Sequence, residues 1–425
     1  MNNTINDPDF KDRHKLSNTA FTRNRSLNFA TLIHYLLNFR KHSNQVELDQ
    51  FFKHYFGKTE ASQHVTKSAF FQARKYVSYQ AFIELNNLFT NKFYASKNNY
   101  KTWKGFRLCA IDGTSIRLPD EPNIIETFGI QKGRPGQENV SMGMASTFYD
   151  CLNNIIIDSS INPNNTPERE CAIRHHAFAS DKDLIIYDRG YTGFQFFAHH
   201  VQHNLSFCAR AKTRQDSIIK EFLASGKKEA IVKYTPNKPA IRSCTENNLP
   251  VTPITLRLVR IELPTEVEVL VTNLIDKKTY KHQVFKWLYH MRWGIEEGYK
   301  RLKQWIELEN FSGKSALSVK QDFYAKIIAG NLTSLMVLAS QKKVRKRSKK
   351  LKLTYQVNFA QALSKMKHHI IYILRYSHEH IPCAIKRTID YISQSVEAVR
   401  EGRSAPRRLK NIKNDIHFSA YKNAL

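Results

Sequence analysis

Two aspartates stand where predicted strands end. Residues 106–112 form an apolar run that ends at Asp112, before Gly113-Thr114, and residues 184–188 form another that ends at Asp188. Carboxylates at the ends of neighbouring strands lie where α/β sheets place their active sites. Two such carboxylates and a third from a helix can hold two Mg²⁺ ions, which activate a water or 3′-hydroxyl and stabilise the leaving oxygen. The expected chemistry is cleavage or transfer at a phosphate.

The third carboxylate is expected on a long helix predicted over residues 282–305. At about 100° per residue, four polar side chains fall within a sector of roughly 60° on this helix: Tyr289, Arg292, Glu296 and Lys303. A carboxylate flanked by two cations and a phenol suits a metal ligand with phosphate clamps on either side. Glu297 is the competing carboxylate, and its spacing to the other three side chains is the poorer one.

These residues carry a family resemblance. The pattern Tyr289-x2-Arg292-x3-Glu296-x6-Lys303 resembles the Y-R-E-K signature of bacterial insertion-sequence DDE transposases of the cut-and-paste type. Neighbouring positions fit the same signature: Trp293, Tyr299, Lys300 and Leu302. Asp112-Gly-Thr and Asp188-Arg-Gly-Tyr resemble the segments of that family's first and second catalytic aspartates. The resemblance covers roughly residues 100–335.

The resemblance implies an RNase H-like core and a set of site residues. Asp112, Asp188 and Glu296 would be catalytic and would ligate two Mg²⁺ ions, for which Mn²⁺ can substitute. The remaining site residues would bind DNA: Tyr289, Arg292 and Lys303 at phosphates near the cleaved end, and Arg189 and Lys300 beside them. A structure should bring the three carboxylates within reach of one metal pair, facing a positive groove.

The implied activity is that of a DNA transposase. It would bind the terminal inverted repeats of its element, cleave the DNA by metal-dependent hydrolysis and join the 3′-hydroxyl ends to target DNA by transesterification. The partners would be double-stranded DNA at transposon ends and target, and a second copy of the chain in a DNA-bound homodimer. Two alternatives remain open: a catalytically inactive, transposase-derived DNA-binding protein, and a metal-dependent DNA nuclease without strand transfer.

Whether cleavage passes through a DNA hairpin on the transposon end is a separate question. Relatives that form such a hairpin stack a flipped base on a tryptophan in a β-rich insertion of the core. In this chain the insertion is predicted at residues 216–280, which contain no tryptophan. Either the step is absent or another side chain, such as Tyr234, takes this role.

The order of predicted elements indicates an α/β protein with a mixed sheet. Strands are expected at 141–149 and 154–161, joined as a hairpin, and at 205–212, with helices at 167–176 and 194–202. Antiparallel strands are expected at 230–234, 254–262 and 267–273. The predicted organisation is a helical DNA-binding region (1–100), an RNase H-like catalytic core (101–215 and 281–340), a β-rich insertion (216–280) and a basic helical C-terminal region (341–425).

The terminal regions leave several alternatives. Residues 1–25 are polar and are expected to be mobile. Residues 68–74 and 78–88 fit either a helix-turn-helix, with Lys67, Arg74 and Lys75 facing DNA, or a small helical bundle. The cations of residues 342–352 are expected in a solvated loop between helices at 318–341 and 358–375, with contacts to phosphates. Cys171, His175 and His176 are expected on a helix surface, without a metal.

Charge narrows the choice of partner. Lys and Arg number 66 against 37 Asp and Glu, so the formal net charge of the 425 residues is +29. Such a charge favours binding to polyanions, of which nucleic acid is the first candidate and an anionic membrane the second. The longest apolar stretch, 327–338, is too short to span a bilayer and contains Asn331, Thr333 and Ser334. With six scattered cysteines and no signal-peptide pattern, we expect a cytoplasmic protein without a membrane partner. The family resemblance adds the expectation of a bacterial, nucleoid-associated protein.

Overall fold

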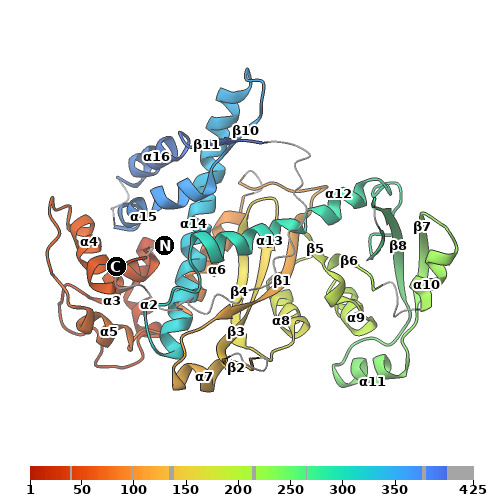
Figure 1. The fold of residues 1–425 in the computed structure, drawn as a ribbon, viewed down its shortest axis with the longest axis horizontal. Coiled ribbons are helices and arrows are strands. Elements are labelled where there is room, and N and C mark those ends of the chain that lie inside the picture. Colours follow the sequence, from red (N-terminus) through yellow and green to blue (C-terminus); the bar gives the residue numbers. More distant parts are fainter. Residues whose placement is uncertain are drawn as a thin grey trace.

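A mixed β-sheet forms the centre of the protein (Figure 1). The computed structural model describes residues 1–38, 41–96, 99–133, 138–212, 217–264, 266–375 and 380–399. Within these ranges the sheet has nine strands. Eight follow the order β2-β3-β1-β5-β6-β9-β8-β7, and the ninth, β4, also pairs with β3. The first part of this order carries the candidate site, and the last part extends the sheet to one end of the molecule.

Five strands form the RNase H-like core. The hairpin of β3 (Val140–Asp150) and β4 (Ile155–Pro163) lies beside β1 (Arg107–Arg117), which is antiparallel to β3. On its other side β1 runs parallel to β5 (Asp183–Tyr187), which is in turn parallel to β6 (Ser206–Arg210). The order β4-β3-β1-β5-β6, with only β3 antiparallel to the other four, is the RNase H-like topology. The predicted α/β fold class with a mixed sheet is therefore confirmed.

Helices connect the parallel strands of this core. The crossovers are α8 (Glu168–His175), which leads to β5, and α9 (Phe194–Gln202), which leads to β6, as the sequence predicts. Short elements follow or precede them: α7 (Pro122–Phe128), β2 (Ile130–Gln131), η1 (His176–Phe178) and η2 (Arg189–Tyr191). The turn η2 comes directly after Asp188 and so shapes the backbone around that residue.

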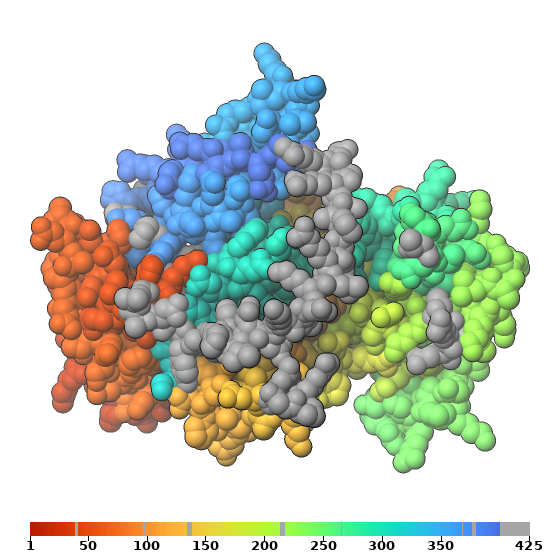
Figure 2. Space-filling view, viewed as in Figure 1, coloured from red at the N-terminus to blue at the C-terminus, as the bar shows by residue number. Residues whose placement is uncertain are grey.

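The strands predicted between residues 216 and 280 are confirmed. β7 (Glu229–Tyr234), β8 (Ile254–Glu262) and β9 (Val267–Thr272) are antiparallel to one another, and β9 pairs with β6. They therefore continue the core sheet. Two helices not predicted from the sequence accompany them: α10 (Ser217–Ala224) and α11 (Lys238–Glu246). In the space-filling view this region and the N-terminal helices lie at opposite ends of the molecule (Figure 2).

The single helix predicted over residues 282–305 is wrong. The chain forms α12 (Val284–His290) and α13 (Trp293–Lys300), followed by a π-helical turn, η3 (Arg301–Trp305). Between the two helices the amides of Arg292 and Gly294 bond to carbonyls three residues back. The chain is therefore wound more tightly at the point where Gly294 packs on the β3–β4 turn. This contact is close, since a Cβ on Gly294 would lie 3.2 Å from Cys151 Cβ.

The first 25 residues are ordered, in contrast to the expected mobility. Ile5 and Phe10 are buried in the main core. Six helices make up the N-terminal region as far as it is described: α1 (Asn2–Ile5), α2 (Pro8–His14), α3 (Phe29–Leu37), α4 (Asn44–Phe56), α5 (Lys67–Arg74) and α6 (Gln80–Tyr94). These apolar anchors hold the polar segment in place.

Arg74 does not face DNA. It is buried and donates hydrogen bonds to Gln321 Oε1 (2.9 Å), Ser312 Oγ (2.8 Å) and Asp322 Oδ1 (3.0 Å). Asn86 in α6 likewise donates to the carbonyl of Ile157 in β4 (3.1 Å). Both helices of the predicted helix-turn-helix are therefore packed on the core, as in the alternative helical bundle, whereas Lys67 and Lys75 remain exposed.

The helix α14 (Ala316–Ser348) extends further than predicted. Much of the basic segment at 342–352 is therefore its last turns and not a loop, while residues from Arg403 lie outside the described ranges. Within those ranges α14 alone is long and apolar enough to cross a membrane, but 72% of its most apolar window is buried in the protein. Two short strands and two helices follow and pack in the same main core: β10 (Tyr355–Val357), α15 (Phe359–Arg375), α16 (Ile381–Ile392) and β11 (Val396–Ala398).

Replacing Arg74 tests its structural role. Arg74→Ala should lower the free energy of unfolding by roughly 3–5 kcal/mol, because it leaves the buried carboxylate of Asp322 without its cation. Urea unfolding followed by circular dichroism measures this change. The adjacent exposed cation serves as the control, and Lys75→Ala should unfold at the wild-type midpoint. Equal midpoints for both variants would show that the buried pair does not stabilise the fold.

Candidate active site

The sheet register places Asp112 and Asp188 side by side. The last registered pair between the parallel strands β1 and β5 is Ala110 with Ile186. Each aspartate lies two residues beyond its member of that pair, so both reach the same level of the sheet. The prediction that a strand ends at Asp112 is wrong, because β1 continues to Arg117 and pairs Asp112 with Thr147 of β3. It is β5 that ends here, and Asp188 follows it directly.

The glycines after the two aspartates orient the carboxylates. The amide of Gly113 donates to Asp112 Oδ1 at 2.9 Å, and the amide of Gly190 donates to Asp188 Oδ1 at 2.7 Å. A Cβ on Gly190 would lie 2.9 Å from the same Asp188 oxygen. A larger residue at position 190 would therefore push the Asp188 carboxylate away from its present position.

Arg292 joins the helix to the central strand. Its Nη2 donates to Glu296 Oε1 at 2.7 Å, and its Nη1 lies 3.7 Å from Asp112 Oδ2. Glu296 is thus linked to Asp112 through one guanidinium. Glu297 points elsewhere, since its side chain is 57% exposed and its nearest cation is Lys300, at 4.0 Å. Of the two neighbouring carboxylates, Glu296 is therefore the one that Arg292 links to the first aspartate.

Aromatic rings support the guanidinium. Arg292 Cζ lies 6.0 Å from the centre of the Tyr289 ring and 5.8 Å from that of Trp293. Tyr289 is buried, and burial raises its pKa to about 12. Although burial opposes the charged form of Arg292, Tyr289, Glu296 and Asp112 together raise its pKa. Arg292 is therefore held as a cation at the edge of the carboxylates.

Lys303 reaches the same strand from the π-helical turn. Its Nζ donates to the carbonyl of Ser115 at 2.6 Å and lies 3.9 Å from Glu309. Arg292 and Lys303 thus approach β1 at two points three residues apart, the side chain of Asp112 and the carbonyl of Ser115. The other two predicted DNA contacts, Arg189 and Lys300, are exposed and are not part of this set of contacts.

A buried network that the sequence does not reveal holds the main chain of Asp112. Its carbonyl accepts hydrogen bonds from Tyr299 (2.6 Å) and Ser146 Oγ (3.3 Å). His175 lies between Ser146 Oγ (3.0 Å) and Asp158 Oδ2 (2.7 Å). The expected surface position of His175 is wrong, as are those of Cys171 and His176, because the helix α8 turns these side chains into the core. The network fixes the strand that carries Asp112.

Glu168 is a further carboxylate at the site that the sequence does not single out. It begins α8, and a Cβ on Gly113 would lie 3.0 Å from its Cγ. Partial burial and the charge of Asp188 raise the pKa of Glu168. Burial raises the pKa of Asp112 to about 7, with Asp188 and Glu168 adding to the shift against the opposing effects of Gly113 and Arg292. The site is an acidic spot in a strongly basic protein.

The donor set suits a divalent cation. Carboxylate oxygens on a rigid sheet are the ligands that Mg²⁺ and Mn²⁺ prefer, and the mutual repulsion of these acids is what a bound cation relieves. As arranged, however, no three His, Cys, Asp or Glu side chains in the described ranges lie close enough to hold one ion. The expected convergence of three carboxylates on one metal pair is therefore not met, and Glu296 is instead paired with Arg292.

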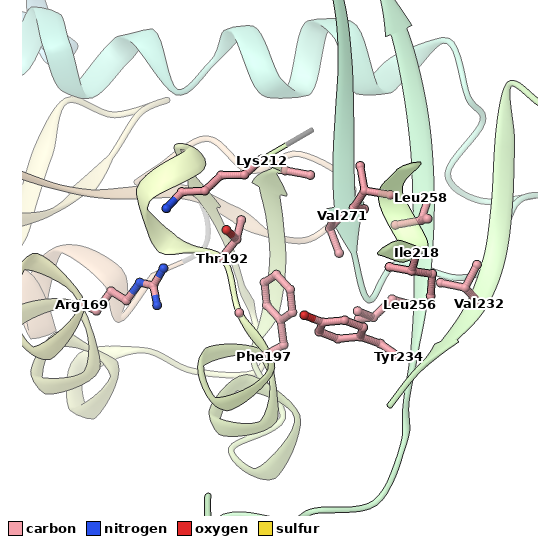
Figure 3. Close-up of a pocket in the computed structure, with 13 residues that line it drawn as sticks. Arg169, Thr192, Phe197, Lys212, Ile218, Val232, Tyr234, Leu256, Leu258 and Val271 are labelled. Atoms are coloured by element: carbon pink, nitrogen blue, oxygen red, sulfur yellow. The ribbon is translucent and has the colours of Figure 1, made fainter. Parts of the chain in front are cut away.

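A pocket lies between α9 and the strands β7–β9, and its lining includes Thr192, just after the turn η2 (Figure 3). Its volume is about 140 Å³. The rings of Phe197 and Tyr234 meet in its middle, with centroids 6.2 Å apart, while Arg169 and Lys212 lie on one side. Arg169 also donates to the carbonyl of Gly190 at 2.8 Å. The pocket is therefore aromatic inside, cationic at one side and contiguous with the turn after Asp188.

Comparison with known proteins points to one family. Residues 103–332 match the family model described as "Transposase DDE domain", which is more than half of the chain. The transposase InsG for insertion sequence element IS4 of Escherichia coli (strain K12) is 22% identical over 284 residues. That match covers 64% of this chain and 62% of InsG, so the chain spans about three fifths of that relative's length.

A solved structure is also similar. The piggyBac transposase, determined by cryo-electron microscopy in a synaptic complex with hairpin DNA, is 11% identical, with a TM-score of 0.44. The match covers 95% of this chain and 86% of the piggyBac chain.

The raised pKa of Asp112 predicts a pH-dependent cost to stability. The carboxyl ionises near 3.8 when unfolded but at about 7 in the metal-free fold, so ionisation increasingly favours the unfolded state as the pH rises between these values. Asp112→Asn should therefore raise the melting temperature in EDTA at pH 8 and much less at pH 4. Each kcal/mol added to the free energy of unfolding corresponds to a rise of about 2–4 °C in the melting temperature. Glu297→Gln, the exposed control, should leave the wild-type pH profile unchanged, and a profile for Asp112→Asn parallel to wild type would contradict the prediction.

Proposed function

Because this chain belongs to the family of transposases with a DDE domain, we propose that it excises and inserts a DNA element. It would bind the terminal inverted repeats of that element, cleave the DNA and join the freed 3′-hydroxyls to target DNA by transesterification. The observation that best supports this proposal is the alignment of Asp112 with Asp188 and the link from Asp112 to Glu296 through Arg292.

Asp112, Asp188 and Glu296 are the proposed catalytic residues and metal ligands. Two Mg²⁺ ions held there, or Mn²⁺ in their place, would supply an activated water or 3′-hydroxyl and stabilise the leaving oxygen. The protein contributes the positions of the ligands: two are fixed by the sheet and by glycine amides, and the third is presented by α13. Glu296 becomes available when Arg292 turns towards a phosphate.

Arg292 and Lys303 are proposed as phosphate clamps on the cleaved strand. Tyr289 supports Arg292 through its ring, while Arg189 and Lys300 lie outside the central contacts, are exposed, and would meet DNA further along the backbone. Guanidinium and ammonium groups suit this task, since phosphate contacts fix the register of a protein on DNA.

The pocket with Tyr234 is the proposed site for an unpaired base of the transposon end. Phe197 and Tyr234 offer aromatic surfaces on which a base can stack, and Arg169 and Lys212 offer charge for its phosphate. In this proposal Tyr234 takes the role that a tryptophan has in relatives that form hairpins.

The wider assembly follows from the same proposal. Residues 1–100 and the basic segment at 342–352 would contact DNA outside the cleavage site, with the core at 101–215 and 281–340 acting within a DNA-bound homodimer. Such a protein would work at the nucleoid of a bacterial cytoplasm.

The products of the reaction separate this function from the two alternatives. An inactive DNA-binding derivative would yield no cleavage, and a nuclease would yield cleavage without joined products. Sequencing of end–target junctions therefore distinguishes the three functions.

Alanine substitutions test the catalytic assignment. Asp112→Ala, Asp188→Ala and Glu296→Ala should each reduce Mg²⁺-dependent cleavage of end DNA by a factor on the order of 10³ or more, because each removes a ligand from the proposed metal site. Gel shifts should show that binding to end DNA is retained. Glu297→Ala, one residue along the helix, should cleave normally. An inactive Glu297→Ala beside an active Glu296→Ala would mean that the helix register is wrong.

Salt dependence tests the clamps. Arg292→Ala and Lys303→Ala should weaken binding to end DNA and lower the magnitude of the log K against log [salt] slope by about 0.9 each, as expected for one lost phosphate contact. Fluorescence anisotropy across a salt series measures both quantities. Arg242→Ala, which removes an 84% exposed cation in α11, is the control and should leave the slope unchanged. An unchanged slope for Lys303→Ala would remove that residue from the interface.

A further inference from the structure

The side chain of Tyr191 ends in a hydroxyl group that is buried and unpaired. Tyr191 belongs to the turn η2, which follows Asp188, and its amide donates to the carbonyl of Asp188 at 3.3 Å. The residue is 0% exposed, and within the described residues its hydroxyl has no hydrogen-bond partner. A buried hydroxyl without a partner lowers stability, and native structures contain few such groups. This hydroxyl is therefore a cost to the free protein.

A second tyrosine in the same apolar cluster shows the ordinary arrangement. Tyr187, the last residue of β5, is also buried, and its ring centroid lies 5.3 Å from that of Tyr191. The hydroxyl of Tyr187 lies 2.8 Å from His176 Nε2 and 3.0 Å from His200 Nε2, so it can accept one hydrogen bond and donate another. The fold thus satisfies one of two adjacent phenols and leaves the other without a partner.

The charges nearest to this unpaired hydroxyl belong to the carboxylates of the site. Burial raises the pKa of Tyr191 well above its usual range, and the negative charges of Asp112, Glu168 and Asp188 raise it further, with Asp112 contributing the most of the three. A neighbouring carboxylate disfavours the ionised phenol and can accept a hydrogen bond from the neutral one. Tyr191 is therefore a protonated donor in an environment of acceptors.

Asp112 has an oxygen available for such a donor. Its Oδ1 accepts from the amide of Gly113 at 2.9 Å, whereas its Oδ2 has only the 3.7 Å approach of Arg292 Nη1, which is too long for a hydrogen bond. In the proposed function Arg292 turns towards a DNA phosphate. The Asp112 Oδ2 atom would then be without even this partner.

We propose that Tyr191 is a positioning residue, whose hydroxyl donates a hydrogen bond to the carboxylate of Asp112 when the site is assembled on end DNA. This inference rests on the proposed function and adds to it a residue that has no role in the Y-R-E-K signature. The bond fixes the Asp112 carboxylate after Arg292 has turned away. A hydroxyl that is unfavourable in the free protein thereby stabilises only the assembled state, which is the kind of interaction that favours catalysis.

Removal of the hydroxyl tests this role, because a structural and a positioning hydroxyl predict opposite results. Tyr191→Phe should melt in EDTA at the wild-type temperature or above it, since the variant lacks an unsatisfied buried group. It should bind end DNA as tightly as wild type. Its cleavage should be about 10-fold slower or more, the size expected for the loss of a hydrogen bond to a charged group.

Tyr187→Phe is the matched control from the same cluster. It should melt below wild type, because the buried rings of His176 and His200 lose their shared partner. Its folded fraction should cleave end DNA at the wild-type rate. The two variants therefore differ in opposite directions, one in stability and the other in cleavage.

A spectroscopic measurement follows the hydroxyl without cleavage. The tyrosine doublet in the ultraviolet resonance Raman spectrum reports whether a phenol donates a hydrogen bond, and the difference between wild type and Tyr191→Phe isolates residue 191. This difference should show a phenol without an acceptor in the free protein. It should show a hydrogen-bond donor after addition of end DNA and Ca²⁺, used in place of Mg²⁺.

The outcomes separate this inference from the proposed function. A lower melting temperature or wild-type cleavage for Tyr191→Phe, or a difference spectrum that DNA leaves unchanged, would overturn the role of Tyr191. Equally slow cleavage by Tyr187→Phe would also overturn it, because the loss would then come from packing beside Asp188. A wild-type protein that does not cleave end DNA would instead contradict the proposed function.

Discussion

Arg292 lies between carboxylates that come from distant parts of the chain. It bonds to Glu296 on its own helix and approaches Asp112 on the central strand, and no other cation in the described residues forms an ion pair with Asp112. Within the described residues Arg292 is also the only cation that forms an ion pair with Glu296. The helix α13 packs closely on the β3–β4 hairpin through Gly294 and Gly298, and Arg292 joins this packed segment to the central strand.

The net charge of +29 overstates what is available to DNA. Several cations are structural: Arg74 is buried with Asp322, Arg107 with Asp183, and Arg257 bonds to Glu229. Each of them ties together segments far apart in the sequence and has little access to a ligand. The charge that can attract a polyanion lies instead on exposed side chains. The carboxylates of the site are a local exception, because they attract cations and repel a phosphate that arrives without one.

Sequence patterns predicted most of the strands well, since apolar runs are a local signal, whereas the catalytic role of the acidic residues stays a prediction. Apolar runs marked β5 and the β3–β4 hairpin, and the spacing of Arg292 and Glu296 survives as an i, i+4 pair. Errors arose where tertiary packing decides. Asp112 lies inside a strand because β3 continues to pair beyond the end of β5, and Arg74 is buried because α14 supplies its acceptors. Glu168 carries no motif, and only the docking of α8 brings it to Asp112.

The break in the predicted helix gives each signature residue a separate task. Tyr289 belongs to α12 and packs in the core, the pair Arg292–Glu296 faces β1 across the first turn of α13, and Lys303 reaches Ser115 from the π-helical turn. Arg292 cannot serve Glu296 and a DNA phosphate equally well at once. In the proposed function, DNA that takes Arg292 frees Glu296 for a cation, so DNA and cation strengthen each other's binding. Linkage requires that this coupling be equal in both directions, because binding free energies around a closed cycle sum to zero.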